Sequence, residues 1–384
     1  MKLSIQYKIL YFAFFIVLIT SLWKNNIYLL FSFSILCWVF LPKRKWWDNS
    51  TIFLLFFSLF YGIMVYMNHM VGSVFNLLSY FIAPVAFYRF GQCSMNIFKE
   101  ENSRQKFILG VVLCYLIYLF ILTLKDIAIV GIVNETRVLL GDLGNFNALN
   151  ATLYGMMSSI GIGCIGSIFT KKQKLWIKLV FILLSIFSLL TVIHLVNRTG
   201  LIVCCACLVI SFIISTKFNI SRMVGILAIL LLIVFILVSN NIIDQEIFDA
   251  YSKREESSTH DSSSMGGRSR LWLYSIENLL TRPFGWSANE YGLAHNLWLD
   301  IARVGGLLPF LPFLAVTFLY LKNLLRLIKK RASSNFIIIM ISINIGMLLS
   351  SAVEPVIGGS LLFFCLLMTI WGMTKSLAVE KIDK

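Results

Sequence analysis

The sequence predicts an all-α fold, a polytopic bundle of about twelve transmembrane helices, on the basis of three observations. The 384 residues are 59% hydrophobic and only 13% charged, whereas a soluble domain carries roughly 25% charged residues. The mean hydropathy is +0.85. Apolar runs long enough to cross a hydrocarbon layer of about 30 Å recur along the chain. Such a chain cannot cover itself with polar surface, so lipid must be its solvent.

The predicted spans follow one another with short connections in most places. In chain order they cover residues 9–23, 27–41, 51–67, 73–90, 107–124, 147–169, 176–193, 199–215, 223–239, 296–321, 335–353 and 356–374. The first two spans are short, and a helical hairpin is an alternative for them. The first resembles a signal peptide in its basic start, but no small-residue cleavage site precedes Trp23, so we expect it to be retained.

Lysine and arginine counts in alternate loops predict the orientation. With the N-terminus inside, the cytosolic segments hold 23 of the 33 basic residues and the external segments hold 10. Only 5 of the 18 acidic residues fall on the cytosolic side. The formal net charge of +15 therefore reports membrane topology, with both termini cytosolic, and does not indicate binding to nucleic acid.

Two long external connections divide the chain into three parts. Residues 1–239 hold nine spans with an external loop at 125–146, residues 240–295 form a large external loop, and residues 296–384 hold three spans and a cytosolic tail. Within the large loop, residues 269–281 predict an amphipathic helix lying on the membrane surface. Its apolar and small residues at helical spacing are Leu271, Trp272, Ser275, Ile276, Leu279 and Leu280.

Two external segments carry arginines close to predicted helix ends. Arg198 lies in Asn-Arg-Thr-Gly at the outer mouth of two spans, where a charge is costly unless it finds a partner or reaches water. Arg268 and Arg270 start the amphipathic helix after two glycines, where backbone amides and guanidinium groups together make an anion site. The alternatives are an interfacial anchor for Arg198 and lipid headgroup contacts for Arg268 and Arg270.

Two further external segments complete the candidate set. His295 lies where the chain re-enters the membrane, with Arg303 two turns deeper, and imidazole is a suitable general base near neutral pH. Arg137 precedes an Asn-rich stretch that leads into the sixth span. Glu290 and Glu354, both external, are alternative bases. The four histidines of the chain show no metal-ligand spacing, so we expect no metal and no other cofactor.

Together these four segments resemble the O-antigen polymerase and O-antigen ligase family of bacterial envelope proteins. The likeness extends from Arg137 to about Pro312 and rests on the order of its pieces. These are Arg137 with Gly141 and Asn150, Arg198 at a helix mouth, Arg268 with Trp272, the turn Pro283-x-Gly285 before His295-Asn296, and Gly305-Gly306. Asn197 stands where Ser or Thr is common in the family, which leaves the local hydrogen bonding open.

The resemblance implies a glycosyltransferase of the membrane-embedded C-type fold, acting at the periplasmic face of the bacterial inner membrane. Its substrate would be an undecaprenyl-diphosphate-linked oligosaccharide, and a chain-length regulator and a flippase would be its partners. A polymerase moves the growing chain onto the next lipid-linked unit, whereas a ligase moves the finished chain onto lipid A core. The compact external loop and the Ala-His-Asn-x-Trp-Leu-Asp stretch favour a polymerase.

The same resemblance assigns roles to the candidate residues. Breaking a bond between sugar and diphosphate requires stabilisation of negative charge, which arginine supplies where no metal motif exists. We assign this role to Arg137, Arg198 and Arg268, with Arg270 and Arg303 as further candidates, and the role of base to His295. Direct attack by the acceptor would invert the anomeric carbon. A lipid or solute transporter is the remaining alternative, disfavoured because nearly all charges lie at helix ends rather than at mid-membrane.

Overall fold

The computed structural model describes residues 4–22, 26–42, 47–68, 70, 73–139, 151–170, 173–215, 268–287, 293–330 and 334–380. Nine helices within these ranges are long and apolar enough to cross a membrane. They are α3 (Asn49–Met67), α4 (Val74–Ile97), α5 (Glu101–Val130), α6 continued by the 3₁₀ helix η1 (Ala151–Phe169), α7 (Leu175–His194), α8 (Arg198–Ser215), α14 (Leu307–Lys329), α15 (Asn335–Val353) and α17 (Leu361–Val379). The prediction of an all-α polytopic membrane protein is confirmed.

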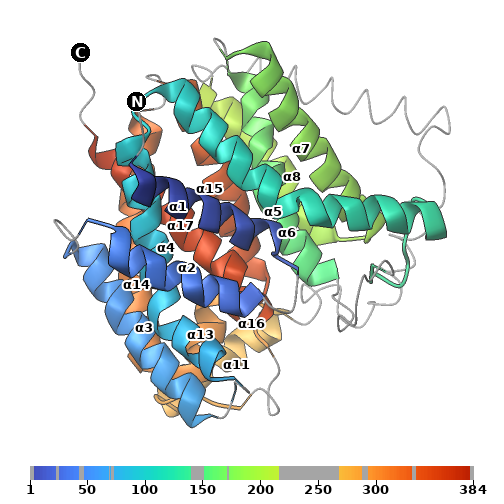
Figure 1. The fold of residues 1–384 in the computed structure, drawn as a ribbon. Helices are drawn as coiled ribbons and strands as arrows, with labels where there is room; N and C mark the ends of the chain where they lie inside the picture. The colour runs from blue at the N-terminus through green and yellow to red at the C-terminus, as the bar shows by residue number, and fades with distance from the viewer. Residues whose placement is uncertain are drawn as a thin grey trace.

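The remaining described helices are shorter. α1 (Ile5–Ile19) and α2 (Asn26–Phe40) are apolar, have 15 residues each and pack on one another. At 1.5 Å per residue each is about 22 Å long, less than a full hydrocarbon layer. Three other helices, α11 (Arg268–Thr281), α13 (Leu297–Gly305) and α16 (Val356–Gly359), lie close together at the lower end of the bundle in Figure 1.

One group of helices surrounds the packed pair α4 and α17. Gly91 of α4 lies against the Thr369 carbonyl and Gly372 of α17 lies against the Tyr88 carbonyl, so closely that any Cβ at either position would overlap backbone. This approach lets α1 and α2 cover one side of the pair while α3 and α14 pack beside it. α4 continues to Ile97, beyond the predicted end at residue 90.

A second group consists of α6, α7, α8 and α15, which pack on one another. Gly163 at the end of α6 lies against the backbone of Ile343 in α15, where a Cβ would come within 2.5 Å of its Cα. The 30-residue helix α5 contacts α1 of the first group and α6 and α7 of the second, and Figure 1 shows it running between them.

The structure corrects one predicted span. Residues 296–321 do not form a single helix, because α13 ends at Gly305 and α14 begins at Leu307. Gly306 between them has φ +60, and a Cβ there would overlap the Pro283 carbonyl oxygen. That carbonyl accepts the Leu307 amide at 2.8 Å. Hydropathy alone does not register this break because both sides of it are apolar.

Another predicted span differs in a simpler way. The last one, 356–374, is shifted to Leu361–Val379, because Pro355 and the short helix α16 come first and the Ser360 side chain caps α17 at the Phe363 amide. The predicted span 223–239 lies outside the described residues.

Candidate functional site

His295 occupies a tightly held turn before α13. Its φ of +52 is in the left-handed region, which residues other than glycine rarely adopt. The buried Asp300 carboxylate accepts the amides of the residues on either side, Ala294 at 2.9 Å and Asn296 at 3.2 Å. The Trp272 indole of α11 donates to the Ala294 carbonyl at 2.8 Å. The turn is therefore fixed from both α13 and α11.

The carboxyl of Asp300 is itself removed from water. Burial raises its pKa above the usual value, opposed by the backbone donor Ala294, by the nearby Arg303 and by Asn296. Each of its two carboxyl oxygens accepts one backbone amide, so Asp300 acts as a structural acceptor for the His295 turn.

Asn296 connects this turn to the end of α15. Its side-chain oxygen caps α13 by accepting the amides of Trp298 and Leu299, and its amide nitrogen donates to the Ala352 carbonyl at 2.9 Å. Two residues beyond Ala352 stands Glu354, at the C-cap of α15. Asn296 therefore sets the distance between His295 and Glu354.

Glu354 lies between two of the predicted site residues. Its carboxylate is 2% exposed, with Oε2 3.6 Å from Arg268 Nη2 and 3.9 Å from His295 Nδ1. Both separations are within ion-pair range but longer than a hydrogen bond. Among the described residues, neither Glu354 Oε2 nor His295 Nδ1 has a hydrogen-bond partner.

Arg268, the first residue of α11, contacts both Glu354 and the start of α8. Its Nη1 donates to the Thr199 hydroxyl at 3.4 Å. Thr199 directly follows Arg198, whose Nη2 is buried without a hydrogen-bond partner among the described residues. Two guanidinium groups thus come from neighbouring helix N-termini, where backbone amides also favour anions.

Asn197 caps α8 and links it to α6. Its Oδ1 accepts the Gly200 amide at 3.0 Å, and its Nδ2 donates to the Ala151 carbonyl at 2.7 Å. The Ala151 amide in turn donates to the Arg137 carbonyl at 2.9 Å. The hydrogen bonding that the sequence left open at Asn197 is therefore a helix cap plus a bond to α6. Ala151 links the Arg137 carbonyl to Asn197, the residue before Arg198.

The site consequently joins five segments that are distant in sequence. Arg137, Arg198, Arg268, Glu354 and His295 lie along one continuous path of contacts at the ends of α6, α8, α11, α13 and α15.

The other predicted residues lie elsewhere. Arg303 is 5% exposed inside α13, and its carbonyl accepts the Trp286 amide at 2.8 Å. Arg270 is exposed, donates to the Tyr274 hydroxyl at 3.0 Å and lies 5.3 Å from the centre of that ring. Glu290 lies outside the described residues. Their predicted roles stay predictions.

Sequence reasoning missed several positioning residues. Asp300 stood in the stretch used for the family resemblance, yet its contact with the His295 turn was not foreseen. Within the described ranges, His, Cys, Asp and Glu side chains do not gather in groups of three that would hold a metal ion. The charged and titratable groups of the described site are guanidinium, imidazole and the two buried carboxylates of Glu354 and Asp300.

The fold and the site define a polytopic membrane protein with a cationic site built at helix ends. The family model described as O-antigen ligase matches residues 179–314. This region contains Arg198, Arg268, Arg303 and His295 and ends within α14. Over this region the chain is similar to the O-antigen polymerase and ligase family, whose members are glycosyltransferase-like enzymes. A search of curated proteins finds no match.

Proposed function

We propose that the chain is an O-antigen (surface polysaccharide) polymerase of the bacterial inner membrane. It would join undecaprenyl-diphosphate-linked repeat units at the periplasmic face, within the C-type membrane glycosyltransferase fold, alongside a flippase and a chain-length regulator. The observation that supports this most is the gathering of Arg268, Glu354 and His295, with Arg268 also contacting Thr199, the neighbour of Arg198.

The proposed reaction uses these groups without a metal. The acceptor hydroxyl oxygen attacks the anomeric carbon of the donor, forming the new glycosidic bond as the bond to diphosphate breaks. The bonding electrons pass to the diphosphate oxygen, where Arg198 and Arg268 stabilise the charge. The acceptor proton passes to His295. A single displacement of this kind inverts the anomeric carbon.

Glu354 fits the role of a positioning residue better than that of the base. It is almost completely buried, and it faces His295 Nδ1, so the Nε2 side of the ring is left for the acceptor. A carboxylate beside the imidazole stabilises the imidazolium that forms on proton transfer, as the aspartate does in the Ser-His-Asp triad of serine proteases. Glu354 also holds the Arg268 guanidinium near the same point.

A ligase is the second candidate, favoured by the description of the matching family model, O-antigen ligase. The two activities share the donor chemistry and differ in the acceptor, which is another lipid-linked unit for the polymerase and lipid A core for the ligase.

Surface polysaccharide in cells tests the proposal and separates the two candidates. We expect Arg268→Lys, Arg198→Lys and His295→Ala each to lower long-chain polysaccharide. Lysine lacks the two-pronged donor geometry of arginine, and loss of one electrostatic donor costs on the order of 10²-fold in rate. His295→Ala removes the proposed base. Arg282→Lys, at an exposed position just after the end of α11, is the matched control and should resemble the parent.

The residual product identifies the reaction. A single repeat unit on the core indicates a failed polymerase, whereas no repeat unit on the core indicates a failed ligase. Normal long-chain polysaccharide from all three site variants, at parental protein level in the membrane, would contradict the proposed function.

A further inference from the structure

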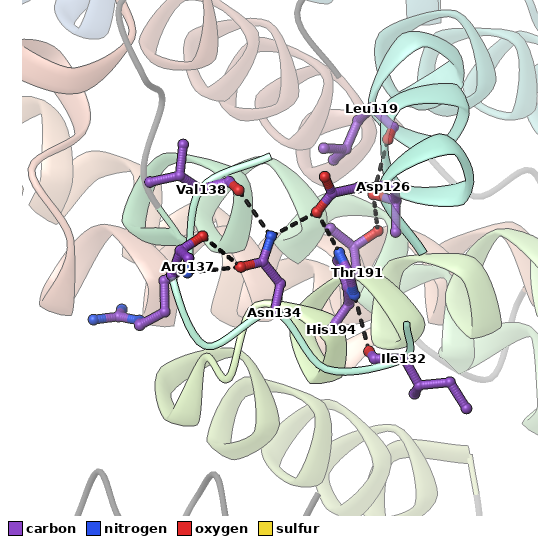
Figure 2. Close-up of polar contacts among 10 residues, drawn as sticks. Leu119, Asp126, Ile132, Asn134, Arg137, Val138, Thr191 and His194 are labelled. Carbon is purple, nitrogen blue, oxygen red and sulfur yellow. Dashed lines mark hydrogen bonds and ion pairs between the residues drawn. The ribbon is translucent and has the colours of Figure 1, made fainter. Parts of the chain in front are cut away.

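A buried acid–base pair lies beneath the Arg137 turn and takes no part in the proposed chemistry. Asp126 of α5 and His194 of α7 are both 0% exposed, with His194 Nε2 2.7 Å from Asp126 Oδ2. The other ring nitrogen, Nδ1, is 2.9 Å from the Ile132 carbonyl oxygen. Figure 2 shows these contacts together with the Arg137 turn.

The hydrogen positions in this pair follow from its partners. A carbonyl oxygen only accepts, so His194 Nδ1 must donate its proton to Ile132. One further proton is then shared between His194 Nε2 and Asp126 Oδ2, and the pair as a unit is electrically neutral. A neutral, fully hydrogen-bonded pair is tolerated inside a helix bundle, whereas removal of one partner leaves an uncompensated polar group.

Asn134 transmits the geometry of this pair to the Arg137 turn. Its Nδ2 donates to Asp126 Oδ2 at 2.6 Å and to the Val138 carbonyl at 2.8 Å, while its Oδ1 accepts the Arg137 amide at 3.2 Å. The Asn134 amide donates to the His194 carbonyl at 2.7 Å. One side chain therefore bonds the backbone of both Arg137 and Val138.

The Arg137 turn needs such support. Arg137 has φ +59, and holding a residue other than glycine in this region costs on the order of 1–3 kcal/mol. Asp126 is an obligate acceptor toward Asn134, so it orients the Asn134 amide with Nδ2 inward and Oδ1 toward the Arg137 amide. In Figure 2 the Arg137 guanidinium extends away from this cluster, and the Arg137 carbonyl is tied to Ala151, beside Arg198.

We infer that Asp126, His194 and Asn134 form a positioning relay that holds Arg137 in the conformation that binds the donor diphosphate. Clamping α5 to α7 alone does not require this relay, since an apolar pair of similar volume serves that purpose equally well. What the polar groups add is a defined orientation of Asn134. The inference rests on the proposed function, because it takes Arg137 as a diphosphate ligand.

A double-mutant cycle tests the relay with purified protein and a lipid-diphosphate-linked oligosaccharide. Asp126→Asn keeps the side-chain shape but replaces one acceptor oxygen by a donor. We expect turnover at limiting donor to fall by about 10-fold or more in the parent, and to fall by less than about 2-fold when Arg137 is already Lys, because groups that act as a unit are non-additive.

A matched control separates positioning from helix clamping. Thr191→Val removes the 3.1 Å contact between Thr191 and Thr123, which also joins α7 to α5 but does not touch Asn134. It should leave turnover near the parental value. If Asp126→Asn does not fold, Asn134→Ala replaces it, because it leaves the Asp126–His194 pair intact, and the same non-additivity with Arg137→Lys is expected.

The outcomes are distinguishable. Equal fold-losses from Asp126→Asn in the parent and in Arg137→Lys, or no loss at all while Arg137→Lys and Arg268→Lys are impaired, would overturn the relay alone. Parental turnover in both Arg137→Lys and Arg268→Lys would instead count against the proposed function.

Discussion

Three residues in or next to the candidate site have an unfavourable, left-handed backbone conformation. Among the described residues, those other than glycine with positive φ are Arg137, Val196 and His295. Each stands in or directly before a segment of the candidate site. The turns of Arg137 and His295 are also held by hydrogen bonds from residues outside them, Ala151 for the first and Asp300 and Trp272 for the second. Strain of this kind persists only where the surroundings over-determine it, which is common at binding and catalytic sites.

The sequence predicted which polar residues gather, but not how they are held. Arg198, Arg268 and His295 stood out because each is a charged or titratable group beside a predicted helix end, within an ordered set of motifs. Glu354 was predicted only as an external acid that could serve as an alternative base. Its contact with both Arg268 and His295 depends on the packing of α11, α13 and α15, which no local pattern encodes. The left-handed φ values were equally unforeseeable, since neither glycine nor asparagine occupies those positions.

Glu354→Gln tests the positioning role of the buried carboxylate. Glutamine keeps the size and one acceptor oxygen but not the charge, so the imidazolium formed at His295 loses its stabilising partner. We expect turnover to fall on the order of 10²-fold. The control Glu277→Gln, at an exposed position of α11, should behave as the parent.

His295→Ala identifies which of the two residues is the base. If Glu354 were the base, His295→Ala would retain most of its activity while Glu354→Gln would lose it. Parental turnover in Glu354→Gln would show that the Glu354 carboxylate has no role in the reaction.

At the scale of elements, the sequence was enough to predict which segments are membrane-spanning helices, but not where each helix begins and ends. Long apolar runs must be helical in lipid because every backbone group needs an internal partner, and this accounts for the correspondence from α3 to α8. The boundaries depend on contacts that hydropathy does not contain. α5 extends from Glu101 to Val130, beyond the predicted 107–124, and α13 and α14 separate at Gly306.

α11 shows how an amphipathic helix uses both of its faces. The predicted helix at residues 269–281 corresponds to Arg268–Thr281. Its buried residues are the polar Ser275 and Asn278, whereas Leu273, Ile276 and Leu280 are exposed. The exposed apolar stripe fits the expected contact with the membrane surface, while the polar stripe rests on the protein beside α13.

Gly306→Ala tests the break between α13 and α14. An added methyl group would meet the Pro283 carbonyl and would also require φ +60 from alanine. We expect a loss of stability of about 1–3 kcal/mol or more, measured as a lower unfolding midpoint in detergent. Gly358→Ala is the control, because a Cβ at Gly358 has nothing within 4 Å. Equal midpoints for the two variants would show that the junction is adaptable.

At the scale of the whole molecule, the predicted cytosolic and external segments do not mix. Arg104, in the first turn of α5 and before the predicted span 107–124, pairs with Glu380 at 2.8 Å. Lys330 donates to the Leu377 carbonyl at 3.1 Å, so three segments predicted to be cytosolic meet at the end of α17. The segments predicted to be external meet around Glu354 instead. In Figure 1 the end of α17 and the group α11, α13 and α16 lie at opposite ends of the bundle.

This separation agrees with the charge count, which used no structural information. The excess of lysine and arginine at the α17 end predicts that this end faces the cytosol, and the periplasmic placement of the proposed site depends on that prediction.

Single-cysteine labelling tests the orientation directly. Thr281→Cys places a thiol at the exposed end of α11, and Lys99→Cys places one in the exposed connection between α4 and α5. The parent chain with its own cysteines replaced is the background, because Cys205 is exposed. In cells with a permeabilised outer membrane, a membrane-impermeant maleimide should label Thr281→Cys, and should label Lys99→Cys only after the inner membrane is also opened. The reverse pattern would place Arg268, Glu354 and His295 on the cytosolic side, where the contacts among them would remain but a periplasmic lipid-linked donor would not reach them.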